Sequence, residues 1–214
     1  MMRPKMTLRA RGATMVLGAL CFATALGMSS GIAHSKPSSE IKVQRASLNV
    51  LARHRASVSG AVASAPAGQR VSLQRRGSHG WQTINRASTR VGGAFTVRFR
   101  PNRIGSAKVR LAWGSVRRGL GRLNVYRRAA VSWYGPGLYG NALSCGGRLE
   151  PGTLGVAHKT LPCGARVTLR RGHRVVRVKV VDRGPFVAGR EFDLTAATRA
   201  RLHFGGVGSV LVAS

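Results

Sequence analysis

Acidic residues are the scarcest feature of this 214-residue chain, which has five Asp and Glu against 36 Lys and Arg and a formal net charge of +31. A positive field of this size attracts polyanions such as nucleic acid, an anionic membrane surface or anionic wall polymers, and it says nothing about fold. The excess is concentrated in residues 36–129, which hold twenty basic residues and a single acid, Glu40. Which of these polyanions the protein can meet depends on its cellular compartment.

Long apolar runs are also missing. The most apolar segment, Ala13–Met28, has sixteen residues, fewer than the roughly 20 that a membrane-spanning helix needs. Four basic residues and no acid precede it, and small residues follow it. This three-part layout is typical of a secretory signal peptide, which we place at residues 1–35; an uncleaved N-terminal anchor is the alternative. We therefore expect an exported protein without a transmembrane segment after signal removal.

Export also bears on nucleic acid as a partner. It removes the chain from the chromosome, and the sequence has no helix-turn-helix, zinc-finger or RNP motif. We expect no nucleic-acid partner in vivo, although a cation of this charge would bind DNA in a test tube. Anionic wall polymers are the polyanions that remain in an extracytoplasmic compartment.

Cysteine is rare as well. Of the three cysteines, Cys21 belongs to the predicted signal peptide, which leaves Cys145 and Cys163. Two cysteines in an exported chain allow one intramolecular pairing, so we predict a disulfide between them; two free thiols are the alternative. Because CxxC spacing is absent and no fourth ligand is evident, the sequence predicts no metal site. Nothing in it calls for a cofactor.

Short alternating segments organise the middle of the chain. Residues 36–46 are polar, basic and Ser-rich, and we interpret them as a linker. Between residues 47 and 128, six strand-like runs alternate with turn signals, a pattern typical of a small β-sandwich. The pattern resembles immunoglobulin-like modules. The predicted strands are Ala56–Gly60, Arg70–Gln74, Trp81–Ile84, Ala94–Phe99, Ala107–Leu111 and Gly121–Val125.

The composition changes at about residue 129, beyond which Gly is denser and acids appear. Val175–Val181 alternates as a half-buried strand, and Val207–Val212 is predicted to be a closing strand. A short helix is predicted to follow Asp193 and to end at Leu202, with Asp193 or Thr195 as its N-cap. Short strands with one or two helical turns favour a small barrel over residues 129–214, so the chain is predicted to be mainly β.

One acid in this region has a pattern that suggests chemistry. Asp182 ends the alternating strand with the parity of Val178 and Val180, which predicts that it shares their buried face. Gly184–Pro185 then breaks the strand and would place Asp182 at a barrel rim. A carboxylate on an apolar face is a candidate general acid. The alternative is that Asp182 only caps the following turn or pairs with Arg183.

Four motifs occur in order over the last 85 or so residues and together resemble the rare lipoprotein A (RlpA-like) family, which is also similar to the first domain of expansins. The resemblance implies a six-stranded double-psi β-barrel. The motifs are Val131-Ser132-Trp133-Tyr134-Gly135-Pro136-Gly137, Ala157-His158-Lys159-Thr160-Leu161-Pro162-Cys163-Gly164, Val181-Asp182-Arg183-Gly184-Pro185-Phe186 and Asp193-Leu194-Thr195.

The resemblance also implies that peptidoglycan glycan strands are the target and that the chemistry is that of a lytic transglycosylase. In that reaction the 6-hydroxyl of MurNAc attacks its own C1 and leaves a 1,6-anhydro end. A single carboxylic acid can protonate the leaving oxygen and then accept the hydroxyl proton, and a second, water-activating carboxylate is unnecessary. Asp182 matches the family's acid/base. The protein would then act in the cell wall.

Other motif residues receive roles by the same resemblance. His158 is predicted to orient Asp182 or hold the glycan; alternatively, it satisfies a backbone group in a tight turn. Trp133 and Tyr134 are predicted to form a sugar-stacking wall, with buried core aromatics as the equal alternative. We assign Thr160 and Arg183 to substrate binding as well. Arg183 beside Asp182 would favour its ionised form, which opposes a general-acid role.

The sequence departs from the family at one place. Active members commonly carry a Glu just after the Gly that precedes the motif His by twelve positions, and here Gly147 stands there. Glu150 falls where relatives often have Asp. The departure supports an alternative function: a non-catalytic, expansin-like protein that binds wall glycan.

Overall fold

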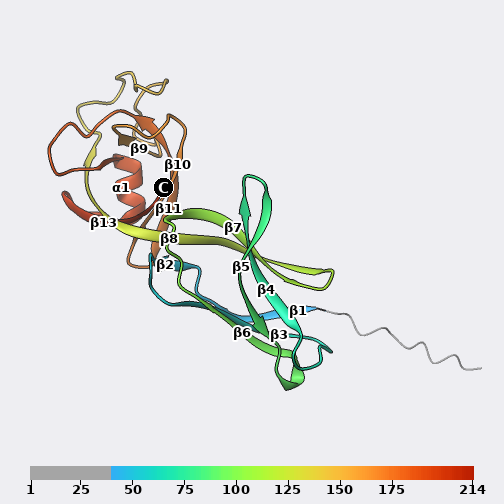
Figure 1. The fold of residues 1–214 in the computed structure, drawn as a ribbon. Helices are drawn as coiled ribbons and strands as arrows, with labels where there is room; N and C mark the ends of the chain where they lie inside the picture. Colours follow the sequence, from blue (N-terminus) through green and yellow to red (C-terminus); the bar gives the residue numbers. More distant parts are fainter. Residues whose placement is uncertain (1–39) are drawn as a thin grey trace, which may run out of the picture. The chain divides into compact units, whose positions relative to one another are not determined.

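The computed structural model describes residues 40–214, which form a mainly β protein (Figure 1). The predicted signal peptide and the first residues of the predicted linker lie outside the described residues. Two hydrophobic cores are present, one among the N-terminal strands and one inside a C-terminal barrel. Within residues 40–214, no helix is long and apolar enough to cross a membrane.

Two sheets make up the N-terminal part. One is the antiparallel sheet β1-β3-β6, and the other has the order β5-β4-β7-β8, with β2 paired in parallel to β8. Because residues from both sheets form one apolar core, this part is a β-sandwich, as predicted. Its elements are β1 (Ile41–Ala46), β2 (Asn49–Leu51), β3 (Ala56–Val62), β4 (Arg70–Gly77), β5 (Gly80–Ser88), the 3-10 turn η1 (Val91–Gly93), β6 (Ala94–Phe99), β7 (Gly105–Trp113) and the first part of β8 (Val116–Tyr134).

Alternation of apolar and polar residues explains these strands. In β3, every second residue from Ala56 to Val62 is buried and the residues between these are partly exposed, which is the period of two expected of a half-buried strand. The six predicted strands of this region coincide with parts of β3 to β8. The immunoglobulin-like resemblance and the domain boundaries stay predictions.

The predicted linker requires a correction. Residues Ile41–Ala46 form β1, which pairs antiparallel with β3, and Ile41 is only 1% exposed. The neighbouring Lys42, Gln44 and Arg45 hid a period-two pattern in which two β-branched side chains, those of Ile41 and Val43, face the core. Composition therefore indicated a linker where alternation specified a strand.

The C-terminal part is a closed barrel of six strands, in the order β8-β12-β9-β11-β10-β13 and back to β8. Closure leaves no free sheet edge, and its interior holds the second apolar core. The mainly β fold predicted from the sequence, with a double-psi type of barrel at the C-terminus, is confirmed. Besides the second part of β8, its elements are β9 (Gly155–His158), β10 (Arg166–Arg171), β11 (Arg174–Asp182), β12 (Phe192–Thr195), α1 (Ala196–Leu202) and β13 (Gly208–Ala213).

Strand β8 belongs to both parts. Its residues Val116–Val125 pair with β7, and Arg127–Val131 pair with β13. It contributes Leu123 and Val125 to the sandwich core and Ala129 and Val131 to the barrel core. The predicted junction at residues 128 and 129 falls inside this strand.

The single helix of the described residues ends as the sequence suggests, at Leu202. Its N-cap is Thr195, whose side-chain hydroxyl accepts a hydrogen bond from the Thr198 amide. Asp193, the other candidate for the cap, lies within β12 and accepts a hydrogen bond from the Ser132 hydroxyl instead. The helix therefore begins two residues later than a cap at Asp193 would require.

A β-bulge at the end of β11 depends on a glycine. Lys179 and Val180 pair with Gly155 and Val156, but the next pair joins Asp182 to Ala157, so Val181 is the extra residue. A Cβ added to Gly155 would lie 2.3 Å and 2.7 Å from the two methyl carbons of Val181. Gly155 therefore provides the space that the bulge occupies.

We expect Gly155→Ala to lower the free energy of unfolding by about 1–3 kcal/mol, because the added methyl group cannot be placed without moving Val181. Gly152→Ala is the matched control, since a Cβ there meets no atom within 4 Å. Urea unfolding of both variants measures the effect. Equal stabilities would show that the bulge does not need the glycine.

Candidate active site

Asp182 lies just after the bulge, which changes the face on which it is presented. Val180 and Asp182 pair with the consecutive residues Val156 and Ala157 of β9. Consecutive residues of a strand point to opposite faces, so Asp182 does not share the core face of Val180. The parity predicted from simple alternation is therefore wrong, because the extra residue Val181 inverts it. Asp182 is half-buried on the outer face of the barrel.

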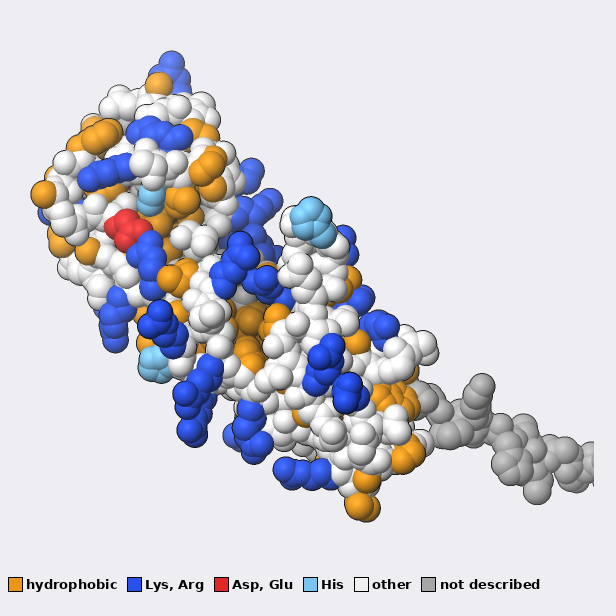
Figure 2. Space-filling model, viewed as in Figure 1, with side chains coloured by type: hydrophobic (Ala, Val, Ile, Leu, Met, Phe, Trp, Pro, Cys, Tyr) orange, Lys and Arg blue, Asp and Glu red, His pale blue; other side chains and the backbone are white. Residues whose placement is uncertain are grey.

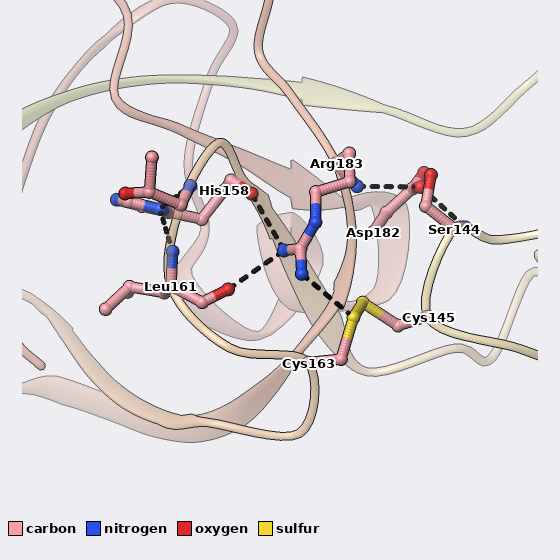
Figure 3. The surroundings of a disulfide bond; sticks show 8 residues. Ser144, Cys145, His158, Leu161, Cys163, Asp182 and Arg183 are labelled. Atoms are coloured by element: carbon pink, nitrogen blue, oxygen red, sulfur yellow. Dashed lines mark hydrogen bonds between the residues drawn. A yellow bond between two sulfur atoms is a disulfide. The ribbon is translucent and has the colours of Figure 1, made fainter.

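Two backbone amides hold the Asp182 carboxylate. Its Oδ1 accepts hydrogen bonds from the amide of Ser144, at 2.9 Å, and from the amide of Arg183, at 2.8 Å (Figure 3). Among residues 40–214, no hydrogen bond reaches Oδ2. One oxygen is thus fixed by the backbone, and the carboxylate also interacts with the Tyr134 phenol.

A pocket of about 150 Å³ opens in front of this carboxylate. One wall is the hairpin-like segment 141–149, in which Ala142 and Arg148 form an isolated β-bridge. The pocket combines one acid, one phenol and one amide with apolar side chains, a composition suited to the polar and apolar faces of a sugar. It is lined by Tyr134, Leu138, Asn141, Ala142, Leu143, Leu149 and Asp182.

A second acid shares the outer face with Asp182. Ser132, Asp193, Ala157 and Asp182 are directly paired across β8, β12, β9 and β11, and directly paired residues point to the same face. The two acids flank Ala157 on strands whose backbones are about 10 Å apart. Sequence spacing gave no sign of this arrangement, because eleven positions separate the two acids along the chain.

The Tyr134 hydroxyl belongs to the same group of polar side chains. It is buried and has no hydrogen-bond partner among the described residues. Burial raises the pKa of Tyr134 well above its usual value. The Asp182 carboxylate raises it further through its charge and through hydrogen bonding with the phenol, although the two groups are not within normal hydrogen-bond geometry, and the charge of Asp193 adds to this. The phenol therefore stays protonated and can act as a hydrogen-bond donor beside the Asp182 carboxylate.

Trp133 does not join Tyr134 in a wall. Trp133 directly precedes Tyr134 on β8, so its side chain points to the opposite face, where it packs against the barrel core. The Arg199 guanidinium covers its ring at 4.1 Å. This geometry favours the core-aromatic alternative for Trp133, while Tyr134 lines the pocket with Asp182.

His158 binds its own turn rather than Asp182. Its Nδ1 accepts hydrogen bonds from the amides of Thr160, at 3.1 Å, and Leu161, at 3.0 Å. The ring packs against Phe192 with centroids 4.6 Å apart. This is the alternative in which the histidine satisfies backbone groups of a tight turn. Thr160 is thus close to His158, and both line a second hollow with Lys159 and Glu191.

The Arg183 side chain points away from Asp182. Its guanidinium donates to the carbonyl oxygens of His158 and Leu161 and contacts the Sγ of Cys163 (Figure 3). In Figure 3 this side chain lies between His158 and Asp182. The alternative in which Asp182 pairs with the Arg183 side chain is therefore not found among the described residues, and Arg183 instead fixes the turn at residues 158–163.

An ion pair that sequence reasoning missed lies beside His158. Arg127 donates two hydrogen bonds to the Glu191 carboxylate, and these bonds lower the pKa of Glu191. The His158 Nε2 is 3.9 Å from the same carboxylate. Arg127 and Glu191 are 64 positions apart, so only the pairing of β8 with β12 could have revealed the contact.

The predicted disulfide between Cys145 and Cys163 is confirmed. It links two segments: the one around Ser144, whose amide binds Asp182, and the turn at residues 158–163 that Arg183 holds. The Cys145 amide also donates to the carbonyl of Val181, next to Asp182. The covalent link therefore ties together the backbone on both sides of the carboxylate.

Gly147 lies in the turn beside this disulfide. Its φ of +78° is in the left-handed region, which glycine adopts without strain. Its carbonyl accepts a hydrogen bond from the Leu143 amide at 3.0 Å, which closes the turn around Ser144. Position 147 therefore contributes only backbone to this region, and the turn positions the Ser144 amide.

Comparison with known proteins assigns the class of this barrel. Residues 128–213 match the family described as lytic transglycolase. The match covers β8 from Arg128 onward and every later strand of the barrel. The match is confined to the C-terminal barrel, and there the resemblance to rare lipoprotein A is confirmed.

The particular relatives are RlpA proteins. The chain is 40% identical over 136 residues to the probable endolytic peptidoglycan transglycosylase RlpA of Synechocystis sp. The aligned segment covers 60% of this chain and 40% of that protein. It is 42% identical over 74 residues to the endolytic peptidoglycan transglycosylase RlpA of Campylobacter jejuni, covering 34% of this chain and 27% of that protein. The chain thus spans less than half the length of these relatives.

We expect loss of the disulfide to destabilise the protein and weaken the site. The bond closes a loop with a sequence separation of 18, for which chain entropy gives roughly 3 kcal/mol. Chemical denaturation of Cys145→Ser/Cys163→Ser, compared with the oxidised wild type, measures the loss. Unchanged stability in the double variant would contradict the prediction.

His158 predicts a pH dependence of stability. Burial lowers the pKa of His158 in the folded protein, an effect that the nearby Glu191 carboxylate only partly offsets. Below the ordinary histidine pKa of about 6.5, the unfolded chain therefore binds a proton that the folded chain does not, so stability is lost as the pH falls. Protonation of Nδ1 would also break both amide contacts.

We expect the wild-type melting temperature to fall between pH 7.5 and pH 5.5 and the fall to be smaller in His158→Gln. Thermal unfolding followed by circular dichroism at both pH values tests this expectation. The pH range avoids the carboxyl groups, whose ordinary pKa values are about 4. An identical shift in the variant would assign the effect to the other histidines.

Proposed function

We propose that this chain is an exported, wall-associated protein that cleaves peptidoglycan glycan strands by lytic transglycosylation. The observation that carries the proposal is the Asp182 carboxylate, which is held through Oδ1 by two backbone amides and lines a pocket in the segment that matches the lytic transglycolase family. The names of the RlpA relatives support the same reaction.

Asp182 would act twice in one turnover. The protonated carboxyl gives its proton to the glycosidic oxygen as the bond between MurNAc C1 and that oxygen breaks. The 6-hydroxyl oxygen of the same MurNAc then bonds to C1, and its proton passes to the Asp182 carboxylate. The acid is regenerated, no water is consumed, and the product has a 1,6-anhydro end.

Other residues would bind and position the glycan. The Tyr134 hydroxyl is a protonated donor beside the Asp182 carboxylate and is not within normal hydrogen-bond geometry of any described residue, so it would turn to donate to a sugar oxygen in the pocket. His158, Thr160 and Arg183 would act through the turn that they stabilise, which borders the site. Of the two predicted aromatics, we retain Tyr134 as the one that contacts substrate.

The absence of a Glu at position 147 is compatible with this chemistry. Because the attacking hydroxyl belongs to the substrate, one carboxyl group can complete the proton transfers. Asp193 also lies on the face of Asp182, where its negative charge could stabilise positive charge that develops on the sugar ring. The domain would then keep a second carboxylate near the site without a Glu in the 141–149 segment.

We expect the purified protein to release 1,6-anhydro-muropeptides from purified sacculi and Asp182→Asn to lower the rate by on the order of 100-fold or more. Mass spectrometry of the soluble products measures both rates. Glu40→Gln is a control that makes the same change of charge in the sandwich, and it should cleave at the wild-type rate.

Two results would oppose the proposal. If the wild type binds sacculi but releases no anhydro product, the protein is a wall-binding protein of the expansin kind. If Asp182→Asn cleaves as fast as the wild type, another group is the acid/base.

A further inference from the structure

A basic groove crosses the outer face of the sandwich sheet β5-β4-β7-β8, in a part of the chain that lytic chemistry does not use. We call it the Trp81 groove. It has a volume of about 510 Å³, and the side chains around it combine three cations with one large aromatic ring. It is lined by Arg76, Trp81, Ser106, Ala107, Lys108 and Arg122.

The cations of the groove have no acidic neighbours in sequence. Between Ile41 and Leu149 the chain contains no Asp or Glu. Figure 2 shows the result for one face of the molecule, where Lys and Arg are widespread and Asp and Glu form a small patch. The positive charge of the groove is therefore not neutralised by carboxylates of the sandwich strands.

Strand pairing brings like charges together in this groove. Lys108 of β7 lies directly opposite Arg122 of β8, and like charges in directly opposed positions destabilise a sheet. Arg76 of β4 lies opposite Trp81 of β5. Such a cost to folding is understandable if an anionic ligand offsets it when bound.

One of the three cations, Arg122, is also held in place, unlike a flexible surface side chain. Arg122 donates from Nε to the Ser106 hydroxyl, at 2.9 Å, and from Nη2 to the Ser106 carbonyl, at 2.7 Å. The Ser106 hydroxyl in turn donates to Asn124. Fixing the guanidinium before binding reduces the conformational entropy that a ligand must overcome.

Trp81 serves as a platform for guanidinium groups. The Arg110 Cζ lies 4.1 Å from its ring centroid, and the Arg76 Cζ lies 5.8 Å from it. Arg110 is further held by a 2.8 Å hydrogen bond to Gln74. Because two cations already contact the ring, it is poorly placed to stack against a nucleic-acid base, which is the usual aromatic contribution to single-strand binding.

We propose that the Trp81 groove binds an anionic wall polymer of the phosphodiester type. The groove would contact only the phosphate backbone of this polymer. Guanidinium forks match the paired oxygens of a phosphate, and Lys108 adds a compact charge. This proposal takes only one point from the proposed function, namely that the protein is exported to the compartment in which such polymers occur. It gives the sandwich a binding role separate from cleavage by the barrel.

Binding of poly(glycerol phosphate) to the purified protein, measured by calorimetry at several salt concentrations, tests the proposal. In Arg76→Gln/Lys108→Gln, neither side chain removed makes a hydrogen bond in the described structure, so the fold should persist. We expect Kd to rise about tenfold and the slope of log K against log salt to fall by about 1 to 2, as two phosphate contacts are lost.

Lys42→Gln/Arg45→Gln is the matched control, because it removes one Lys and one Arg that are exposed on β1 of the other sheet. It should change Kd by less than threefold. Equal weakening by the two double variants would overturn the proposal, since diffuse charge would then account for binding.

Two further measurements separate this proposal from its alternatives. Asp182→Asn should bind the polymer as the wild type does, so failure of the catalytic proposal would leave this one standing. A single-stranded DNA of equal phosphate number should bind no more tightly than poly(glycerol phosphate). Much tighter binding of the DNA would show that bases are recognised and would replace the wall polymer with nucleic acid as the ligand.

Discussion

The contact between Val181 and Gly155 determines how the barrel presents its acid. A side chain at position 155 would occupy the space of the two Val181 methyl groups, and without the bulge at Val181 the next residue would continue the alternation into the core. The bulge turns Asp182 to the outer face, where the Ser144 amide and the Tyr134 side chain meet it. Bulges beside active sites often redirect a side chain in this way.

Covalent and hydrogen-bonded ties then stabilise the surroundings of Asp182. The disulfide connects the segment before β9 to the turn after it, and Arg183 binds two carbonyls of that turn. Neither group touches the Asp182 carboxylate with its side chain. Their contribution is to hold backbone amides and walls in position, which is the support that a preorganised site requires.

Much of the fold could be predicted because it follows local patterns. Period-two alternation located β3 to β7 and β11, and the Thr195 cap with its helix followed from ordinary capping preferences. Strand β1 was missed because basic residues masked two inward-facing β-branched side chains. Composition misled where periodicity was the better guide.

The site was less predictable, because its geometry depends on pairing between distant strands. The motifs identified Asp182 and Tyr134, which the fold brings to one pocket. They could not show that a bulge inverts the parity of Asp182, that Arg183 turns away from it, or that Arg127 binds Glu191 across 64 positions. Each of these depends on register, and a single sequence does not contain the register.

Strand β8 has a consequence for how this protein could be assembled from parts. Arg127 and Arg128 form the rungs that pair with Val212 and Leu211 of β13, whereas Leu123 and Val125 complete the other core. A chain that began at residue 128, where the family match starts, would lack the Arg127–Val212 pair of the barrel. The sandwich would be left with an unpaired end of β8. The sandwich and the barrel therefore share strand β8. A gene rearrangement that removed or exchanged one of them would also remove part of the other.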